Sequence, residues 1–293
     1  MHSVSFVRAN GSTDADIKDA IEKSILLVNF NFKQKINRIV IKPNMCYYHH
    51  PSTGEVTDPG FVSTLIDVLR ENFTSNPEIS IVESDATAMK CKYAFKMFKY
   101  DKLAEEKHVR LVNLSEEKTK QIDVRIDSHS FKFSIPEMLL DCDLLVNVPK
   151  IKYMKRPKIT CALKNIFGCI AYHRKSVYHK DLNEAIVAIN KLVRTGLVVV
   201  DGIIVNGKHT KRLNLVMASE DPVSVDAAAA KMLGINPKSV RQIVLAEKEH
   251  IGGLKFIPVG DFSYFQQIFP KKGFTDSVYK AASSGYLQLF HRA

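Results

Sequence analysis

RIVIK at residues 38–42, TDPGFVSTLIDVL at 57–69 and ISIVE at 79–83 follow one another along the chain and alternate between two patterns. The first and third are short β-branched runs, which are typical of buried strands. The middle run predicts a helix, because Thr57 or Asp58 can cap its start and Pro59 suits its first turn. Strand, helix and strand in this order predict a βαβ unit with two parallel strands.

The same alternation continues through most of the chain. We expect further strands at 109–114, 144–148, 197–201 and 213–218, and helices at 93–108, 160–167, 182–193 and 222–233. Residues 122–135 differ, because they alternate with period two around Asp127, Ser128 and His129, which predicts a β-hairpin. The predicted fold class is therefore α/β: a mainly parallel sheet flanked by helices, with an antiparallel β-hairpin insertion. One domain is expected over residues 1–293, with the tail 262–293 packing on the core.

Composition and charge narrow the classes of function. The 293 residues include 42 Lys and Arg against 31 Asp and Glu, and the net charge of +11 favours anionic partners. The start of the chain lacks a signal-peptide pattern and no apolar run reaches the length of a membrane span, so we expect a cytoplasmic protein with no membrane partner. The five cysteines include no C-x-x-C pair, which argues against an iron–sulfur cluster and favours reduced thiols.

Charged and amide side chains follow the expected strands at their carboxyl ends, where open α/β sheets bind ligands. The candidate ligand-binding residues there are Lys42, Asn44, Glu83, Asp85, Lys150 and Lys152, and Asp201 and Asp221 follow the two later strands. We expect all of these groups on one edge of one sheet. Lysines and carboxylates gathered there suit a small anionic ligand, with or without a divalent cation held by oxygen atoms.

The segment SEDPVSVDAAAA at residues 219–230 has two interpretations. Asp221 precedes Pro222 at a helix start, so its carboxylate can simply cap that helix. Asp226 lies one turn further on, and the two carboxylates can instead hold a divalent cation together with Asp201, or act as a general base.

Residues 150–180 form the most basic segment of the chain and leave three alternatives open. The segment can be a mobile loop that closes over an anionic substrate. It can be a nucleic-acid surface, with Tyr153, Tyr172 and Tyr178 interleaved for base stacking. It can also be a solvated charge run.

Lys164 stands apart within this segment, because it lies in an otherwise apolar helical pattern. A lysine in such surroundings has a depressed pKa, which would allow it to act as a catalytic base. Asn165 and His179 complete the candidate ligand-binding residues of the segment.

Six motifs occur in order along the chain. They are IKPN (41–44), TDP (57–59), NVPKIK (147–152), Thr160 with LKNIFG (163–168), VDGI (200–203) and ASEDPVSVD (218–226). In order and spacing they resemble the family named domain of unknown function 362, over about residues 36–245. The resemblance implies the site residues Lys42, Asn44, Lys150, Lys164, Asn165, Asp201, Asp221 and Asp226. Many members of that family carry a ferredoxin-like iron–sulfur segment, and this chain lacks its clustered cysteines.

The sequence indicates an enzyme that acts on a small carboxylate or phosphate metabolite, and it leaves the reaction open. Lysines at 42, 150 and 164 would neutralise the ligand, and Asn44 and Asn165 would orient it. The aspartates at 201, 221 and 226 would hold a cation or act as base. The alternatives are a nucleic-acid-binding protein that uses residues 150–180 and a non-catalytic accessory module of a redox system.

Overall fold

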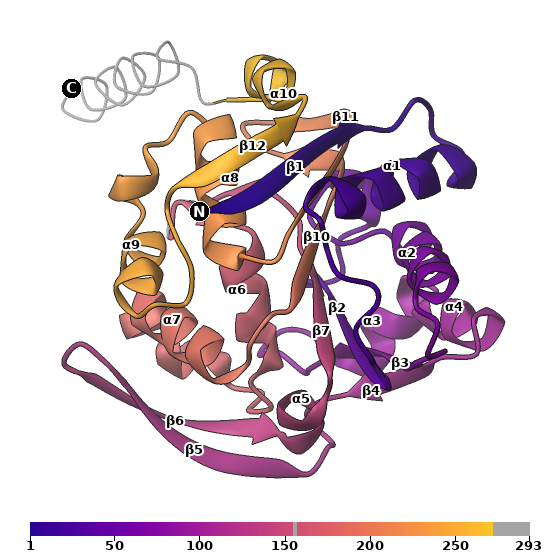
Figure 1. Ribbon diagram of the computed structural model, residues 1–293. Helices are drawn as coiled ribbons and strands as arrows, with labels where there is room; N and C mark the ends of the chain where they lie inside the picture. The colour runs from indigo at the N-terminus through magenta and orange to yellow at the C-terminus, as the bar shows by residue number, and fades with distance from the viewer. Residues whose placement is uncertain (155–156, 272–293) are drawn as a thin grey trace, which may run out of the picture.

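A twisted sheet runs through the centre of the molecule, and helices cover both of its faces (Figure 1). The computed structural model describes residues 1–154 and 157–271. Within these residues, the main path of the sheet runs in the order β12-β1-β11-β10-β7-β2-β3-β4. Its strands are β1 (His2–Arg8), β2 (Arg38–Pro43), β3 (Glu78–Glu83), β4 (Arg110–Asn113), β7 (Leu144–Val148), β10 (Leu197–Asn206), β11 (Thr210–Ser219) and β12 (Phe256–Gly260), joined by the short β8 (Lys152–Tyr153) and β9 (Ile159–Thr160).

The sheet is mainly parallel, as predicted. Strands β10, β7, β2, β3 and β4 pair in parallel, and β12 pairs in parallel with β1. Strand β11 runs against both of its neighbours, since Val198 pairs with Ser219 and Val7 with Val216. The dipeptide Asn206-Gly207 between β10 and β11 is a hairpin signal, so the sequence held a local indication of this reversal.

Two buried clusters lie on opposite faces of the sheet, because successive side chains of a strand alternate between its faces. Ile39 and Ile41 of β2 belong to one cluster, and Val40 between them belongs to the other. The first face is covered by α1 (Asp14–Leu27), α2 (Pro59–Asn72), α3 (Cys91–Met97) and α4 (Tyr100–Glu106). The second is covered by α6 (Ala162–Ile166), α7 (Leu182–Leu192), α8 (Pro222–Met232) and α9 (Arg241–Lys248).

The hairpin insertion is confirmed. Strands β5 (Thr119–Ile126) and β6 (His129–Pro136) pair in antiparallel fashion and lie below the second face, with Phe133 buried there (Figure 1). Asp127 at the turn has a positive φ of 48°, which this residue type tolerates better than most. The short helix α5 (Glu137–Asp141) follows the hairpin.

Several boundaries differ from the expectation. The single helix expected at 93–108 is wrong, because Lys99 adopts a left-handed conformation (φ 61°) that separates α3 from α4. The helix expected at 160–167 is shorter, since Thr160 pairs with Lys152 as a strand residue. The N-terminal β1 and α1 were not expected; Thr13 caps α1 with a capping box.

Four 3-10 helices complete the described secondary structure: η1 (Pro51–Thr53), η2 (Phe167–Cys169), η3 (Lys175–Asp181) and η4 (Pro237–Ser239). In the tail, α10 (Phe262–Ile268) packs on β1, where the rings of Phe262 and Phe6 are 4.8 Å apart. The remainder of the expected tail, 272–293, lies outside the described residues, as do Lys155 and Arg156 of the basic segment. None of the helices that the structure describes is long and apolar enough to cross a membrane.

Candidate functional site

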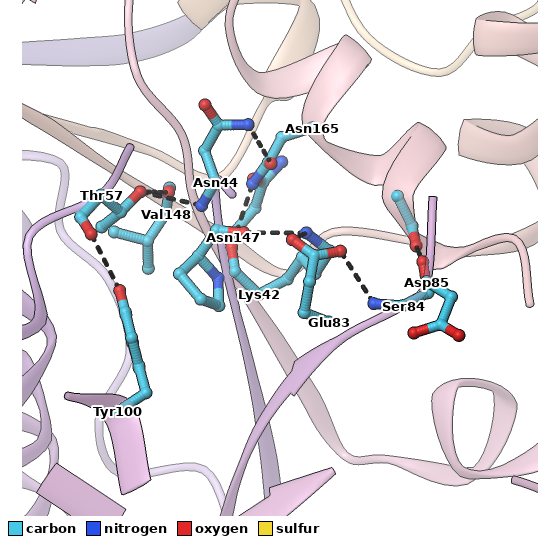
Figure 2. Close-up of polar contacts among 12 residues, drawn as sticks. Lys42, Asn44, Thr57, Glu83, Ser84, Asp85, Tyr100, Asn147, Val148 and Asn165 are labelled. Carbon is cyan, nitrogen blue, oxygen red and sulfur yellow. Dashed lines mark hydrogen bonds and ion pairs between the residues drawn. The ribbon is translucent and has the colours of Figure 1, made fainter. Parts of the chain in front are cut away.

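A chain of three buried asparagines joins the carboxyl ends of β2 and β7 to helix α6 (Figure 2). Asn44 donates from Nδ2 to Asn165 Oδ1 at 3.1 Å, and Asn165 donates from Nδ2 to Asn147 Oδ1 at 2.8 Å. Asn165 also donates to the backbone oxygen of Lys42, and Asn147 donates to that of Ala162. Because buried amides are costly unless they are paired, this network fixes α6 against the ends of both strands.

Lys42 and Glu83 form a buried ion pair at the ends of β2 and β3 (Figure 2). The distance from Lys42 Nζ to Glu83 Oε2 is 2.7 Å, and the two side chains are 1% and 3% exposed. Gly168 closes over the pair, since a Cβ at this position would lie 3.0 Å from Lys42 Nζ and 3.1 Å from Glu83 Oε1. The glycine of the LKNIFG motif is therefore explained by the space that the ion pair needs.

A pocket of about 340 Å³ opens beside this ion pair on the second face of the sheet. Its polar lining includes Lys42, Asn44, Cys46, Glu83, Ser84, Lys152, Thr160, Lys164, Asn165, Lys175 and His179, and its apolar lining includes Met45, Ala86, Met89 and Phe167. Four lysines thus line the pocket with one carboxylate, which is already paired with one of them.

Two of these lysines are buried and tied to fixed acceptors. Lys152 Nζ donates to Asn44 Oδ1 at 2.8 Å and to the backbone oxygen of Glu55 at 2.9 Å. Lys175 Nζ donates to Ser84 Oγ at 2.8 Å and to the backbone oxygen of Asp85. Burial lowers the pKa of Lys152 to about 8 and that of Lys175 to about 8, because the charged amine loses its hydration.

Lys164 differs from the other three lysines of the pocket. Its amine makes no hydrogen bond or ion pair with any residue in the described ranges 1–154 and 157–271, although it lines the pocket. Burial lowers its pKa as well, and the nearest group that opposes this shift is the thiol of Cys46. A half-buried amine without a partner is the group most available to a bound ligand.

Asp226 is a residue of α8 that contacts the N-terminus of α6, and it does not line the pocket. Its Oδ1 accepts a hydrogen bond from the backbone N–H of Leu163 at 3.3 Å, and Oδ2 has no partner among the described residues. Burial raises the pKa of Asp226 to about 7. The carboxyl group therefore anchors the helix that carries Lys164, rather than facing the ligand as we expected.

Asp201 and Lys150 lie in a second pocket, of about 190 Å³, on the opposite face of the sheet. They form a buried ion pair of 3.0 Å, and Asp201 also accepts from the backbone N–H of Asp58 at the start of α2. Asp201 follows a strand that runs parallel to β7 and β2, so it shares the carboxyl edge of the sheet with Lys42 as expected. It follows Val199 on the face of α1 and α2, however, so it does not join Lys42 in one pocket.

Asp221 follows the end of β11, which is three strands away from β2 in the sheet, and it does not line the lysine pocket. Its carboxylate caps α8 and accepts from the backbone of Val223, Ser224 and Gly253 at 2.8–3.1 Å. Asp221 therefore holds the start of α8 and does not join Lys42 and Glu83 in the pocket. Within the described residues, no three His, Cys, Asp or Glu side chains gather closely enough to hold a metal ion, so the three aspartates do not form the expected cation site.

We expect Asp221→Ala to lower the free energy of unfolding by about 2–4 kcal/mol, because it removes a helix cap and leaves buried donors unpaired. Affinity for sulfate should not change, because Asp221 does not line the lysine pocket. Urea unfolding and calorimetry measure the two quantities, with Asp123→Ala on the exposed hairpin as control. A variant with normal stability and no sulfate binding would restore Asp221 to the ligand site.

Asp85 and His179 lie at the border of the lysine pocket. The Asp85 carboxylate accepts from Lys90 Nζ and from the backbone of Cys91, so it caps α3, and its backbone oxygen accepts from Lys175. His179 is exposed on η3 and lines the rim. Asp85 therefore acts on the pocket through Lys175.

The basic segment presents less charge to solvent than its sequence indicates. Three of its lysines are at most 7% exposed: Lys150, Lys152 and Lys175. The ring of Tyr178 packs 5.1 Å from that of Phe133, inside the apolar cluster below α7. These groups are unavailable for stacking or for contacts with a nucleic-acid backbone.

Comparison with known proteins gives the family. A family model described as Domain of unknown function (DUF362) matches residues 39–231, which is more than half of the chain. The chain belongs to the DUF362 family. This DUF362 chain is also 24% identical over 236 residues to a thylakoid-associated protein of Synechocystis sp., a match that covers 76% of this chain and 70% of the relative.

Two solved structures resemble this DUF362 chain at low identity. The lactate racemase apoprotein from Thermoanaerobacterium thermosaccharolyticum matches 80% of this chain at 11% identity with a TM-score of 0.47. A protein from Thermotoga maritima matches 86% at 13% identity with a TM-score of 0.45. The chain spans 58% and 62% of the lengths of these two proteins.

Sequence reasoning missed two lining residues of the DUF362 pocket, Lys175 and Cys46, and one residue of the amide network beside it, Asn147. In the sequence, Lys175 is one of several lysines in a basic run, and nothing local distinguishes it from a solvated lysine. In the structure its side chain is buried and lines the pocket. Asn147 lies inside a strand pattern, and its amide is needed only because Asn165 packs against it. Cys46 lines the pocket, and its position follows from the path of the chain after β2.

Proposed function

We propose that this DUF362 protein is an enzyme that binds a small carboxylate or phosphate metabolite in the lysine pocket. The observation that carries the proposal is the Lys164 amine, which lines a pocket with three other lysines and has no partner among the described residues. Lys42, Lys152 and Lys175 line the same pocket.

The charge balance of the pocket supports an anionic ligand. Glu83 neutralises Lys42, and the amines of Lys152, Lys164 and Lys175 have no carboxylate partner in the part of the chain that the structure describes. Burying a cation without a counter-charge is costly, and here the cost appears as lowered pKa values. An anion bound in the pocket would raise these pKa values again and would offset the cost.

The pocket also has the features of a site for a small molecule. Met45, Met89 and Phe167 provide apolar contact area, while the lysines provide a few fixed polar contacts. Asn44 holds the amine of Lys152 in place, and the amide network holds Asn44. Lys164 in its neutral form would accept a proton, and in its charged form would bind an anionic group.

Sulfate affinity tests the proposal, since sulfate does not itself titrate near neutral pH. We expect sulfate to bind near pH 7 and to lose affinity as the pH rises through about 8, by up to about tenfold per pH unit for each lysine that must be charged. The sign follows from the lowered pKa values: the amines are charged below about pH 8 and neutral above it. Calorimetry in two buffers of different ionisation enthalpy should detect proton uptake on binding.

The matched control is Lys191→Met, which removes an exposed lysine of α7 outside the pocket. It should bind sulfate with the wild-type affinity and pH profile. If sulfate, phosphate and a panel of small carboxylates all fail to bind between pH 6 and 8, the lysine pocket is not an anion site and the proposed function is wrong.

A further inference from the structure

The four lysines of the pocket divide into two kinds. Lys42 donates to Glu83 and to the backbone oxygen of Pro43, and Lys152 and Lys175 each donate to two fixed acceptors. These three amines are held in place by fixed acceptors. Lys164 has no such acceptor among residues 1–154 and 157–271, so its amine is free to move and to react.

The surroundings of Lys164 lower the pKa of its amine, so a larger fraction is neutral at a given pH than for an exposed lysine. The one carboxylate of the pocket lining, Glu83, is held by Lys42. Charge on Lys164 adds to the burial that lowers the pKa of Lys152, so the two amines repel each other when both are protonated. Burial disfavours the charged form of Lys164, with only the Cys46 thiol opposing it. A neutral lysine amine in a pocket is a nucleophile toward carbonyl carbon.

We infer that Lys164 forms an imine with the carbonyl carbon of a small 2-oxo acid, whose carboxylate is bound by the anchored lysines of the same pocket. This inference rests on the proposed function and names its substrate class. A 2-oxo acid carries a carboxylate beside a carbonyl group, so one small molecule satisfies both kinds of lysine. The pocket volume of about 340 Å³ accommodates such a molecule.

The step balances without any other reactant. The lone pair of Lys164 Nζ attacks the carbonyl carbon, and the π electrons of the C=O bond move to oxygen. The two amine protons pass to that oxygen, which leaves as water while the C=N bond forms. No electron is gained or lost. In the imine, the C–H bonds on the carbon next to the C=N carbon become more acidic, as in lysine-dependent carbonyl enzymes.

Borohydride trapping with pyruvate tests the inference on the whole protein. Sodium borohydride reduces an imine to a stable secondary amine, so the wild-type protein should gain one reduced pyruvate adduct, mapped by peptide mass spectrometry to residue 164. Lys191→Met, which lacks an exposed lysine, should be labelled to the same extent. Lys164→Arg, which keeps the positive charge, and Lys164→Met should lose the adduct.

Two results would overturn the inference, and they are distinguishable from failure of the proposed function. The first is the absence of a trapped adduct at pyruvate concentrations that calorimetry shows to saturate the pocket; this would leave anion binding intact. The second is an adduct spread over several surface lysines and retained in Lys164→Arg. If neither pyruvate nor sulfate binds, the proposed function fails as well.

Discussion

Lys42→Met is expected to lower the free energy of unfolding by about 3–5 kcal/mol, because it leaves the buried carboxylate of Glu83 without its cation. Glu83 is 3% exposed, and apart from Lys42 it retains only the backbone N–H of Ser84, at 2.9 Å. Urea unfolding followed by circular dichroism measures the change.

The double variant Lys42→Met with Glu83→Gln supplies the comparison. Removing both charges should restore most of the lost stability, since the penalty arises from an unpaired charge rather than from the missing lysine. Lys107→Met, which breaks the more exposed ion pair between Lys107 and Asp67, should have little effect on stability. If Lys42→Met unfolds at the wild-type urea concentration, the Lys42–Glu83 pair is not buried as described.

Lys164→Met is expected to reduce sulfate affinity by about 2–5 kcal/mol at pH 7, the usual effect of removing one member of a buried charge pair. The free protein should be as stable as the wild type or more stable, because methionine removes an amine that burial disfavours. Calorimetry gives the affinity, and thermal unfolding without ligand gives the stability.

The opposite signs of these two effects make the experiment informative. If Lys164 had only a structural role, its substitution would lower the stability of the protein and leave the affinity for sulfate unchanged. Asn165 is the next residue on α6 and belongs to the amide network, so Asn165→Ala should instead reduce stability through unpaired buried amides. Wild-type sulfate binding by Lys164→Met would exclude Lys164 from the site.

Local pattern predicted much of the fold. The βαβ unit from β2 to β3 follows from β-branched runs and a capped amphipathic helix, both of which are set by neighbouring residues. The hairpin at 119–136 follows from period-two alternation. The break at Lys99 was not predicted, because the apolar pattern continues through it and only the packing of α3 and α4 requires the turn.

The candidate site was predicted in part. Lys42, Asn44, Glu83, Lys152, Lys164 and Asn165 lie together as strand-end reasoning expected. Asp201 and Lys150 do not, since the alternation of side chains places them on the other face of the sheet. Asp221 does not, since β11 lies three strands away from β2 and the Asp221 carboxylate caps α8.

The sequence by itself determined which segments are strands and helices and that charged groups follow the strands, because both are properties of short stretches of chain. Only the tertiary structure decided which of those groups share a pocket. That outcome depends on the order of the strands in the sheet and on the face to which each strand end points, and both are set by pairing between distant strands. The same pairing leaves Lys164 without a partner among the described residues while it anchors Lys42, Lys152 and Lys175, a difference that no property of the four lysines as residues could indicate.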